Sequence, residues 1–243
     1  LQQVCYDALG DNKGAIVVLE PSTGKVLAMV SKPDYDPNDA STDYSEWLTY
    51  DSADSVLLNR ATQGLYPPGS TFKMLTVLEY MKENPNTWQD YVYNCNGSYQ
   101  NGDYTIKCYH GTAHGAQNLI QAFANSCNGA FAEIGRNLDI SAFESLADQL
   151  LFNKELPLDF PYSKSSFSLE ESDPDVLKMM TAIGQGNTLV TPIHMAMLMS
   201  AIANDGVLMT PRVLDHTENY TGMLVERYEP QEYGSLLTSE EAE

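Results

Sequence analysis

Basic residues are scarce in this chain. Lysine and arginine number 13 against 33 aspartates and glutamates, which gives 243 residues a formal net charge of −20. Such a balance repels phosphate backbones and anionic lipid headgroups, so it argues against nucleic acid and anionic membrane surfaces as partners of this portion. The acids are spread along the sequence, and we interpret them as a solvated surface.

Long hydrophobic runs are also missing. No stretch approaches the roughly 20 apolar residues of a membrane span, and the start lacks a basic and apolar leader. The chain opens on Leu1 and not on methionine, which favours the removal of upstream residues. The hydrophobic content of 43% is nevertheless enough for one large domain or two small ones.

Only four cysteines are present. Cys95 and Cys108 enclose 12 residues rich in glycine and asparagine, which predicts a hairpin. We predict a disulfide across it, worth about 3 kcal/mol in the chain-entropy model and typical of an oxidising exterior. Two separate thiols remain an alternative. Zinc bound with His110 and His114 is less favoured because C-x-x-C spacing is lacking.

Local patterns predict several elements. Residues 14–19 and 26–31 are expected to form strands around a turn at 21–24, and 33–66 to be mostly loop with short helices. Residues 70–205 are expected to be mainly helical. The clearest helix has Thr191 as N-cap, Pro192 in first position and Gly206 after its end. A short strand is expected within 207–213, and Thr238 with Glu241 predicts a capping box.

The most informative segment is 66–73, Tyr-Pro-Pro-Gly-Ser-Thr-Phe-Lys. The prolines stiffen the approach and Gly69 permits a tight turn before an apolar pattern of helical period. Ser70 is therefore expected in the first helical turn, with Lys73 one turn further on the same face.

A hydroxyl and an amine so placed favour nucleophilic catalysis. Capping by Ser70 is the simpler alternative. A capping box would have Glu or Gln at position 73, and the helix dipole disfavours a cation there. Lys73 lies between Phe72 and Met74, where desolvation would lower its pKa and let it activate Ser70.

A second motif, Asn125-Ser-Cys-Asn128, separates the apolar stretch 119–124 from a helix-like run over 129–138. From a short loop, Ser126 and Asn128 could hold an amine and a substrate amide by hydrogen bonds. Alone this pattern is more typical of a capped loop between helices. We interpret Cys127 as a small buried filler.

Together, S-x-x-K and S-x-N resemble the motifs of penicillin-binding proteins and serine β-lactamases. Five further segments resemble the transpeptidase domain of penicillin-binding proteins of class B, the monofunctional type. These are 14–30, 33–38, 59–61, 114–115 and 184–192, so the resemblance runs from about residue 14 to about residue 210.

The resemblance implies an α/β (α+β) fold, the penicillin-binding transpeptidase or serine β-lactamase-like fold. We expect mainly its helical lobe plus an N-terminal β-hairpin. The family's K-[ST]-G element is absent from the sequence. We therefore expect a lead-in over 1–13 and a transpeptidase domain over 14–243 that is truncated before that element and lacks its C-terminal strands.

The implied activity is D,D-transpeptidation of peptidoglycan stem peptides ending in D-Ala-D-Ala, with β-lactams acylating the same serine. Ser70 would attack, Lys73 would take its proton, Ser126 would relay the proton, and Asn128 would orient Lys73 and substrate. No cofactor or metal is required. This portion alone should be weakly active or inactive, because half of the oxyanion hole belongs to the K-[ST]-G strand.

The resemblance also implies a membrane-anchored parent acting on the extracytoplasmic face of a bacterial membrane, with other cell-wall synthesis proteins as candidate partners. Other functions remain open. A serine β-lactamase would release hydrolysed antibiotic quickly, whereas a β-lactam or peptidoglycan sensor would acylate without turnover. A structural relative would tolerate loss of Ser70.

Overall fold

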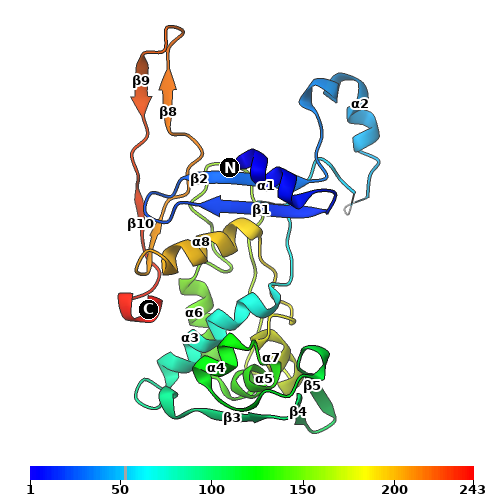
Figure 1. Cartoon of the computed structure of the whole chain (residues 1–243), viewed down its shortest axis with the longest axis vertical. Helices are drawn as coiled ribbons and strands as arrows, with labels where there is room; N and C mark the ends of the chain where they lie inside the picture. The colour runs from blue at the N-terminus through cyan, green and yellow to red at the C-terminus, as the bar shows by residue number, and fades with distance from the viewer. Residues whose placement is uncertain (52–53) are drawn as a thin grey trace. The chain divides into compact units, whose positions relative to one another are not determined.

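The chain forms two compact units in the computed structural model, which describes residues 1–51 and 54–243. Unit 1 comprises Leu1–Leu65, Lys154–Ser165 and Val190–Glu243, and unit 2 comprises Tyr66–Asn153 and Ser166–Leu189 (Figure 1). Both units mix helices with antiparallel strands, as expected of the predicted α/β (α+β) class.

Unit 1 is built around a β-hairpin accompanied by helices. Its elements are α1 (Gln2–Leu9), β1 (Gly14–Leu19), β2 (Val26–Lys32), the 3₁₀ turn η1 (Pro37–Asp39), α2 (Ala40–Trp47), α8 (Pro192–Ile202), β7 (Val207–Met209), β8 (His216–Glu218), β9 (Leu224–Arg227), β10 (Glu232–Ser235) and α9 (Ser239–Ala242).

The β1–β2 hairpin confirms the two predicted strands, with β2 one residue longer than expected. Its antiparallel register places Gly14 opposite Lys32 and Ile16 opposite Val30. Helix α1 packs on β2 and α8 on β1 (Figure 1). Within the described residues, β1 pairs with no strand other than β2.

Helix α8 begins as predicted. The Thr191 hydroxyl accepts a hydrogen bond from the His194 amide, and Pro192 occupies the first turn, where no amide hydrogen is needed. The predicted end at Gly206 is wrong. The helix stops at Ile202, and Asp205 and Gly206 follow with positive φ in the turn toward β7.

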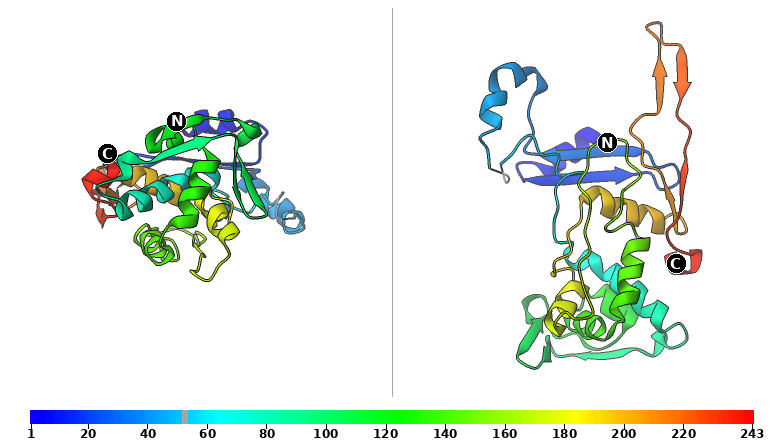
Figure 2. Two further views of the ribbon diagram at one scale, coloured as in Figure 1. Left: turned by 90° about the horizontal axis from the view of Figure 1, so that it is seen from below. Right: turned by 180° about the vertical axis from the view of Figure 1, so that it is seen from behind.

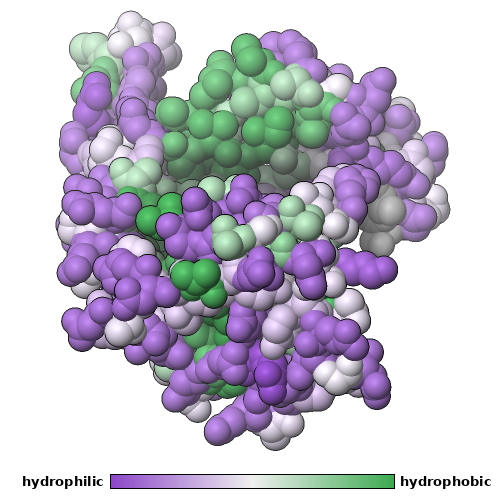
Figure 3. All heavy atoms as spheres, turned by 60° about the horizontal axis from the view of Figure 1, so that its bottom comes forward, coloured by the Kyte–Doolittle hydropathy of each residue, from purple (hydrophilic) through white to green (hydrophobic). Residues whose placement is uncertain are grey.

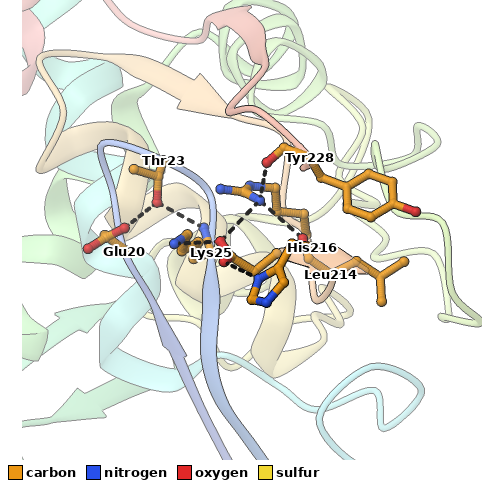
Figure 4. A network of polar contacts seen from close by, with 8 residues as sticks. Glu20, Thr23, Lys25, Leu214, His216 and Tyr228 are labelled. Atoms are coloured by element: carbon orange, nitrogen blue, oxygen red, sulfur yellow. Dashed lines mark hydrogen bonds and ion pairs between the residues drawn. The ribbon is translucent and has the colours of Figure 1, made fainter. Parts of the chain in front are cut away.

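The C-terminal part of unit 1 contains two short ladders, β8–β9 and β7–β10. Strand β7 is shorter than the predicted 207–213. Lys25 forms an ion pair of 2.7 Å with Asp215, and His216 contacts the same carboxylate at 2.9 Å (Figure 4). Hydrogen bonds from Lys25 and His216 hold the pKa of Asp215 below its usual range.

The chain ends on the predicted capping box. Thr238 accepts a hydrogen bond from the Glu241 amide, and the Glu241 carboxylate accepts one from the Thr238 amide. The short helix α9 follows from this reciprocal pair.

Unit 2 combines helices with two further ladders (Figure 2). Its elements are η2 (Gly69–Phe72), α3 (Lys73–Glu83), η3 (Trp88–Asp90), β3 (Val92–Cys95), β4 (Ser98–Asn101), β5 (Tyr104–Lys107), η4 (Tyr109–Gly111), β6 (Gly115–Asn118), α4 (Leu119–Ala124), α5 (Asn128–Asn137), α6 (Ile140–Gln149) and α7 (Asp175–Ala182).

The predicted hairpin between Cys95 and Cys108 is confirmed as β4–β5. The expectation that residues 70–205 are mainly helical fails over residues 92–118, where β3 also pairs with β6. These strands of four residues carry little periodic signal, and their pairing joins segments about twenty residues apart.

Four phenylalanines form the core beneath η2 and α3. The Phe72 ring is fully buried and lies 5.9 to 6.1 Å from the rings of Phe143, Phe152 and Phe167. Phe72 is therefore an apolar anchor between the two candidate reactive residues, Ser70 and Lys73.

The face shown in Figure 3 is mainly hydrophilic, in keeping with the charge of −20, although apolar residues gather in one area of it. None of the helices described over 1–51 and 54–243 has the length and apolar character needed to span a membrane.

Replacing Phe72 tests the anchor. We expect Phe72→Ala to lower the free energy of unfolding by about 3–5 kcal/mol, because a fully buried ring is removed and a cavity remains. Urea denaturation measures the effect. The exposed ring of Tyr104 provides a control, since Tyr104→Ala should change stability by no more than about 0.5 kcal/mol. Equal effects would contradict the role of Phe72.

Candidate active site

Ser70 and Lys73 lie on consecutive short elements, as the sequence predicts. Ser70 is in η2, and Lys73 is the first residue of α3. Neither helix is capped by a side-chain hydrogen bond, so capping does not explain Ser70. Its hydroxyl faces a cavity instead.

Two glycines fix the turn that presents Ser70. Gly69 has φ +58°, and its amide donates to the Gly184 carbonyl at 2.9 Å. Gly184 has φ +74°, and a Cβ there would lie 1.9 Å from the Gly69 carbonyl oxygen. The two backbones can approach this closely only because residue 184 has no side chain.

The Lys73 amine is the centre of a cluster of oxygen atoms. Its Nζ lies 2.6 Å from Asn128 Oδ1, 2.8 Å from the Ser126 carbonyl oxygen and 2.9 Å from Ser126 Oγ. Ser70 Oγ is 3.4 Å away. The structure thus brings together all four residues that the two sequence motifs singled out.

The chemistry of these oxygens is compatible with an uncharged amine. The Ser126 carbonyl and Asn128 Oδ1 can only accept, so each requires an N–H from Lys73. A neutral amine supplies two N–H groups and retains one lone pair. That lone pair is then available to accept a proton from the hydroxyl of Ser70 or Ser126.

Burial of Lys73 favours the uncharged form of its amine. Lys73 is 1% exposed, and desolvation lowers the pKa of its amine from 10.5 to about 8. The neighbouring Cys127 and Cys108 oppose this shift by raising the pKa. Desolvation is the larger effect because water cannot reach the ammonium form.

The loop of Ser126 and Asn128 is held by backbone geometry. Ser126 has φ +50°, a left-handed conformation that costs a non-glycine residue about 1–2 kcal/mol. The backbone amide of Ser126 donates to the Phe123 carbonyl at 2.9 Å. The side-chain nitrogen Nδ2 of Asn128 donates to the Lys107 carbonyl at 3.0 Å. The second bond orients Oδ1 of Asn128 toward Lys73.

A cavity of about 380 Å³ opens onto these groups. The sequence motifs missed part of its lining, because no short pattern marks these positions. The lining residues are Ser70, Tyr109, Thr112, His114, Asn125, Ser126 and Asn128. A larger cavity of about 620 Å³ belongs to unit 1 and is lined by none of the predicted site residues.

The predicted disulfide between Cys95 and Cys108 is wrong. Both are buried free thiols whose sulfur atoms lie 3.6 Å apart, against about 2.05 Å for a bond. Cys127 is fully buried, as expected of a filler, but it also contacts Cys108 at 3.7 Å between sulfurs. His114 Nδ1 lies 3.4 Å from Cys95 Sγ.

The thiols differ in acidity. Burial acts to raise the pKa of Cys95, but the amides of His114 and Gly97 and the His114 side chain outweigh it and lower the pKa to about 6. Burial raises the pKa of Cys127 to about 12. With His114, the three cysteines form the metal-compatible cluster of unit 2, and His110 is not part of it.

Comparison with known proteins identifies the family. The family model described as penicillin binding protein transpeptidase domain matches residues 14–242. The chain belongs to the penicillin-binding protein transpeptidase domain family, as the sequence motifs predicted.

Its relatives include the peptidoglycan D,D-transpeptidases PbpA of Mycolicibacterium smegmatis and Mycobacterium tuberculosis. The first is 33% identical over 234 residues, which cover 88% of this chain and 46% of the relative. The second is 35% identical over 225 residues, which cover 87% and 44%. The chain thus spans less than half the length of these relatives.

Solved structures agree in fold and confirm the predicted fold class. The D,D-transpeptidase domain of a peptidoglycan glycosyltransferase from Eggerthella lenta superposes with a TM-score of 0.88 at 29% identity, covering 99% of this chain and 61% of that one. A penicillin G acyl-enzyme complex of penicillin-binding protein A from M. tuberculosis gives 0.86 at 25% identity, covering 99% and 58%.

Gly184 offers a test of the Ser70 turn. We expect Gly184→Ala to lower the free energy of unfolding by about 1–3 kcal/mol through the clash with Gly69, in addition to about 1–2 kcal/mol for positive φ. Gly102→Ala is the matched control, because φ there is +58° but nothing lies within 4 Å of a new Cβ. Denaturation of both variants separates clash from strain, and equal losses would contradict the close approach.

Proposed function

We propose that this chain is the serine-bearing part of a D,D-transpeptidase that crosslinks peptidoglycan stem peptides and is acylated by β-lactams. The observation that carries the proposal is the contact of one buried amine, Lys73 Nζ, with Ser70 Oγ, Ser126 Oγ and Asn128 Oδ1. The names of the relatives and the acyl-enzyme complexes among the similar structures support it.

In the proposed reaction, Ser70 Oγ attacks the carbonyl between the two terminal D-alanines while the neutral Lys73 amine takes the hydroxyl proton. Ser126, within hydrogen-bond distance of the same amine, passes the proton to the leaving nitrogen. The resulting serine ester is then attacked by an amine of a second stem peptide. A β-lactam carbonyl would form an analogous serine ester when its ring C–N bond breaks, with the leaving nitrogen still attached to the acyl group.

The roles of the remaining groups follow from their positions. Asn128 orients the Lys73 amine and is itself oriented by the Lys107 carbonyl. The Ser70 amide, at the start of η2 and α3, contributes one donor to the oxyanion hole. The other donor belongs to the K-[ST]-G strand of the family, a motif that the 243 residues lack.

We further propose that 1–13 is a lead-in and that 14–243 belongs to an incomplete transpeptidase domain, in line with the family match over 14–242. A substrate in the cell wall implies action outside the cytoplasm. We place the parent protein on the extracytoplasmic face of a bacterial membrane, with other cell-wall synthesis proteins as candidate partners.

A serine β-lactamase would need a group that activates water against the ester. Within the part of the chain that the structure describes, no carboxylate lines the cavity at Ser70. This composition favours a long-lived ester over rapid hydrolysis. Fast release of hydrolysed antibiotic would instead identify a β-lactamase.

Labelling with a fluorescent penicillin tests the proposed roles in the full-length protein. We expect Ser70→Ala to abolish labelling, since no ester can form, and Lys73→Arg to slow it by about 10²–10⁴-fold, since arginine stays protonated. The exposed Ser145 on α6 provides a control, and Ser145→Ala should label normally. Normal labelling of Ser70→Ala would refute the mechanism.

The pKa of Lys73 predicts a pH profile. Because the free amine is the active form and desolvation lowers its pKa to about 8, the second-order rate of acylation should rise with pH up to about 8 and then level off. Well below that pH the rate should fall about tenfold per unit, as the neutral fraction falls. Stopped-flow acylation between pH 6 and 9.5 measures this, and a rate that keeps rising to pH 9.5 would show an ordinary solvated lysine.

A further inference from the structure

We infer that Cys95, Cys108, His114 and Cys127 form a structural zinc site beside the reactive serine. Each residue offers one ligand atom, and these atoms all lie within 4.8 Å of one another. The zinc alternative considered from the sequence included Cys95, Cys108 and His114, but it had His110 in place of Cys127. The four residues are separated by 12, 5 and 12 others and contain no C-x-x-C pair.

Three of the spacings between the ligand atoms match the edges of a tetrahedron. Zinc bonds of about 2.3 Å to sulfur and about 2.0 Å to nitrogen require edges of about 3.8 Å between sulfurs and about 3.5 Å between sulfur and nitrogen. The sulfurs of Cys108 lie 3.6 Å from Cys95 and 3.7 Å from Cys127, while His114 Nδ1 lies 3.4 Å from Cys95. Three of the six edges thus agree to about 0.2 Å.

The surroundings suit a closed structural site. The three cysteines are at most 3% exposed and His114 is half-buried. The Gly97 amide donates a hydrogen bond to Cys95 Sγ at 3.4 Å, which favours the thiolate form that binds a metal. Three sulfurs and one imidazole nitrogen favour zinc over magnesium or calcium, which prefer oxygen ligands.

The backbone holds the ligands from separate elements. Cys95 ends β3, Cys108 follows β5, His114 precedes β6, and Cys127 lies between α4 and α5. Pairing of Cys95 with Gly115 and a hydrogen bond from the Cys108 amide to the Gly97 carbonyl bring the first three together. Binding would replace the protons that the three cysteines still carry with one Zn²⁺ and release them to solvent.

The ion would also brace the active site. Cys127 stands between Ser126 and Asn128, both of which contact the Lys73 amine. A bond from zinc to Cys127 would hold this loop, including the left-handed Ser126, in position. This consequence rests on the proposed function, whereas zinc binding itself does not.

The test measures zinc in the full-length protein purified under reducing conditions. We expect about one zinc per chain by atomic emission, and a thiolate-to-metal absorption band after exchange for Co²⁺. Alkylation should modify the three cluster cysteines only after a chelator removes the metal. The inference would be overturned if the protein prepared in this way bound neither Zn²⁺ nor Co²⁺. It would also be overturned if two of the cluster cysteines formed a disulfide under these conditions.

Matched variants identify the ligands. His114→Ala should weaken zinc binding at least tenfold in a competition titration, whereas His110→Ala, four residues away and exposed, should not. Cys127→Ala should also weaken zinc binding at least tenfold, whereas the control Cys5→Ala should leave zinc affinity unchanged. Unchanged affinity in His114→Ala would remove histidine from the site. Because these readouts need no acylation, their failure is distinguishable from failure of the transpeptidase proposal.

Discussion

The burial of one amine governs the candidate active site. Lys73 is 1% exposed, and an ammonium ion without water is costly unless oxygens surround it or it loses its proton. In the neutral form that burial favours, the two N–H groups can be donated to two carbonyl oxygens while the lone pair stays free to accept a proton from a hydroxyl. The turn at Gly69 and the conformations of Ser126 and Asn128 place the hydroxyls and the amide oxygen that contact this amine.

What the sequence predicted well depends on neighbouring residues. Ser70 and Lys73 share a helical face because they are three apart, and the strands predicted at 14–19 and 26–31 follow from short apolar runs around a proline and glycine turn. The Thr191 cap likewise follows from adjacent residues. Each of these depends on spacing within one element, so no knowledge of tertiary structure was needed.

What the sequence missed depends on distant segments. The β3–β6 pairing unites residues about twenty apart, and the positive φ of Ser126 is imposed by the bonds that close α4. The spacing of Cys95 and Cys108 correctly predicted a hairpin, and His114 was considered as a zinc ligand, but the sequence could not reveal that Cys127 lies at the same point. Tyr109 and Thr112 line the cavity for the same tertiary reason.

The burial of Phe72 has a consequence for regulation. Its ring anchors the segment that carries the proposed nucleophile and the proposed base, so both are attached to the same core. We expect a conformational signal that displaced this core to leave the separation between hydroxyl and amine unchanged. We therefore expect tuning of reactivity to act on the opposing loop of Ser126 and Asn128, which contacts the same amine.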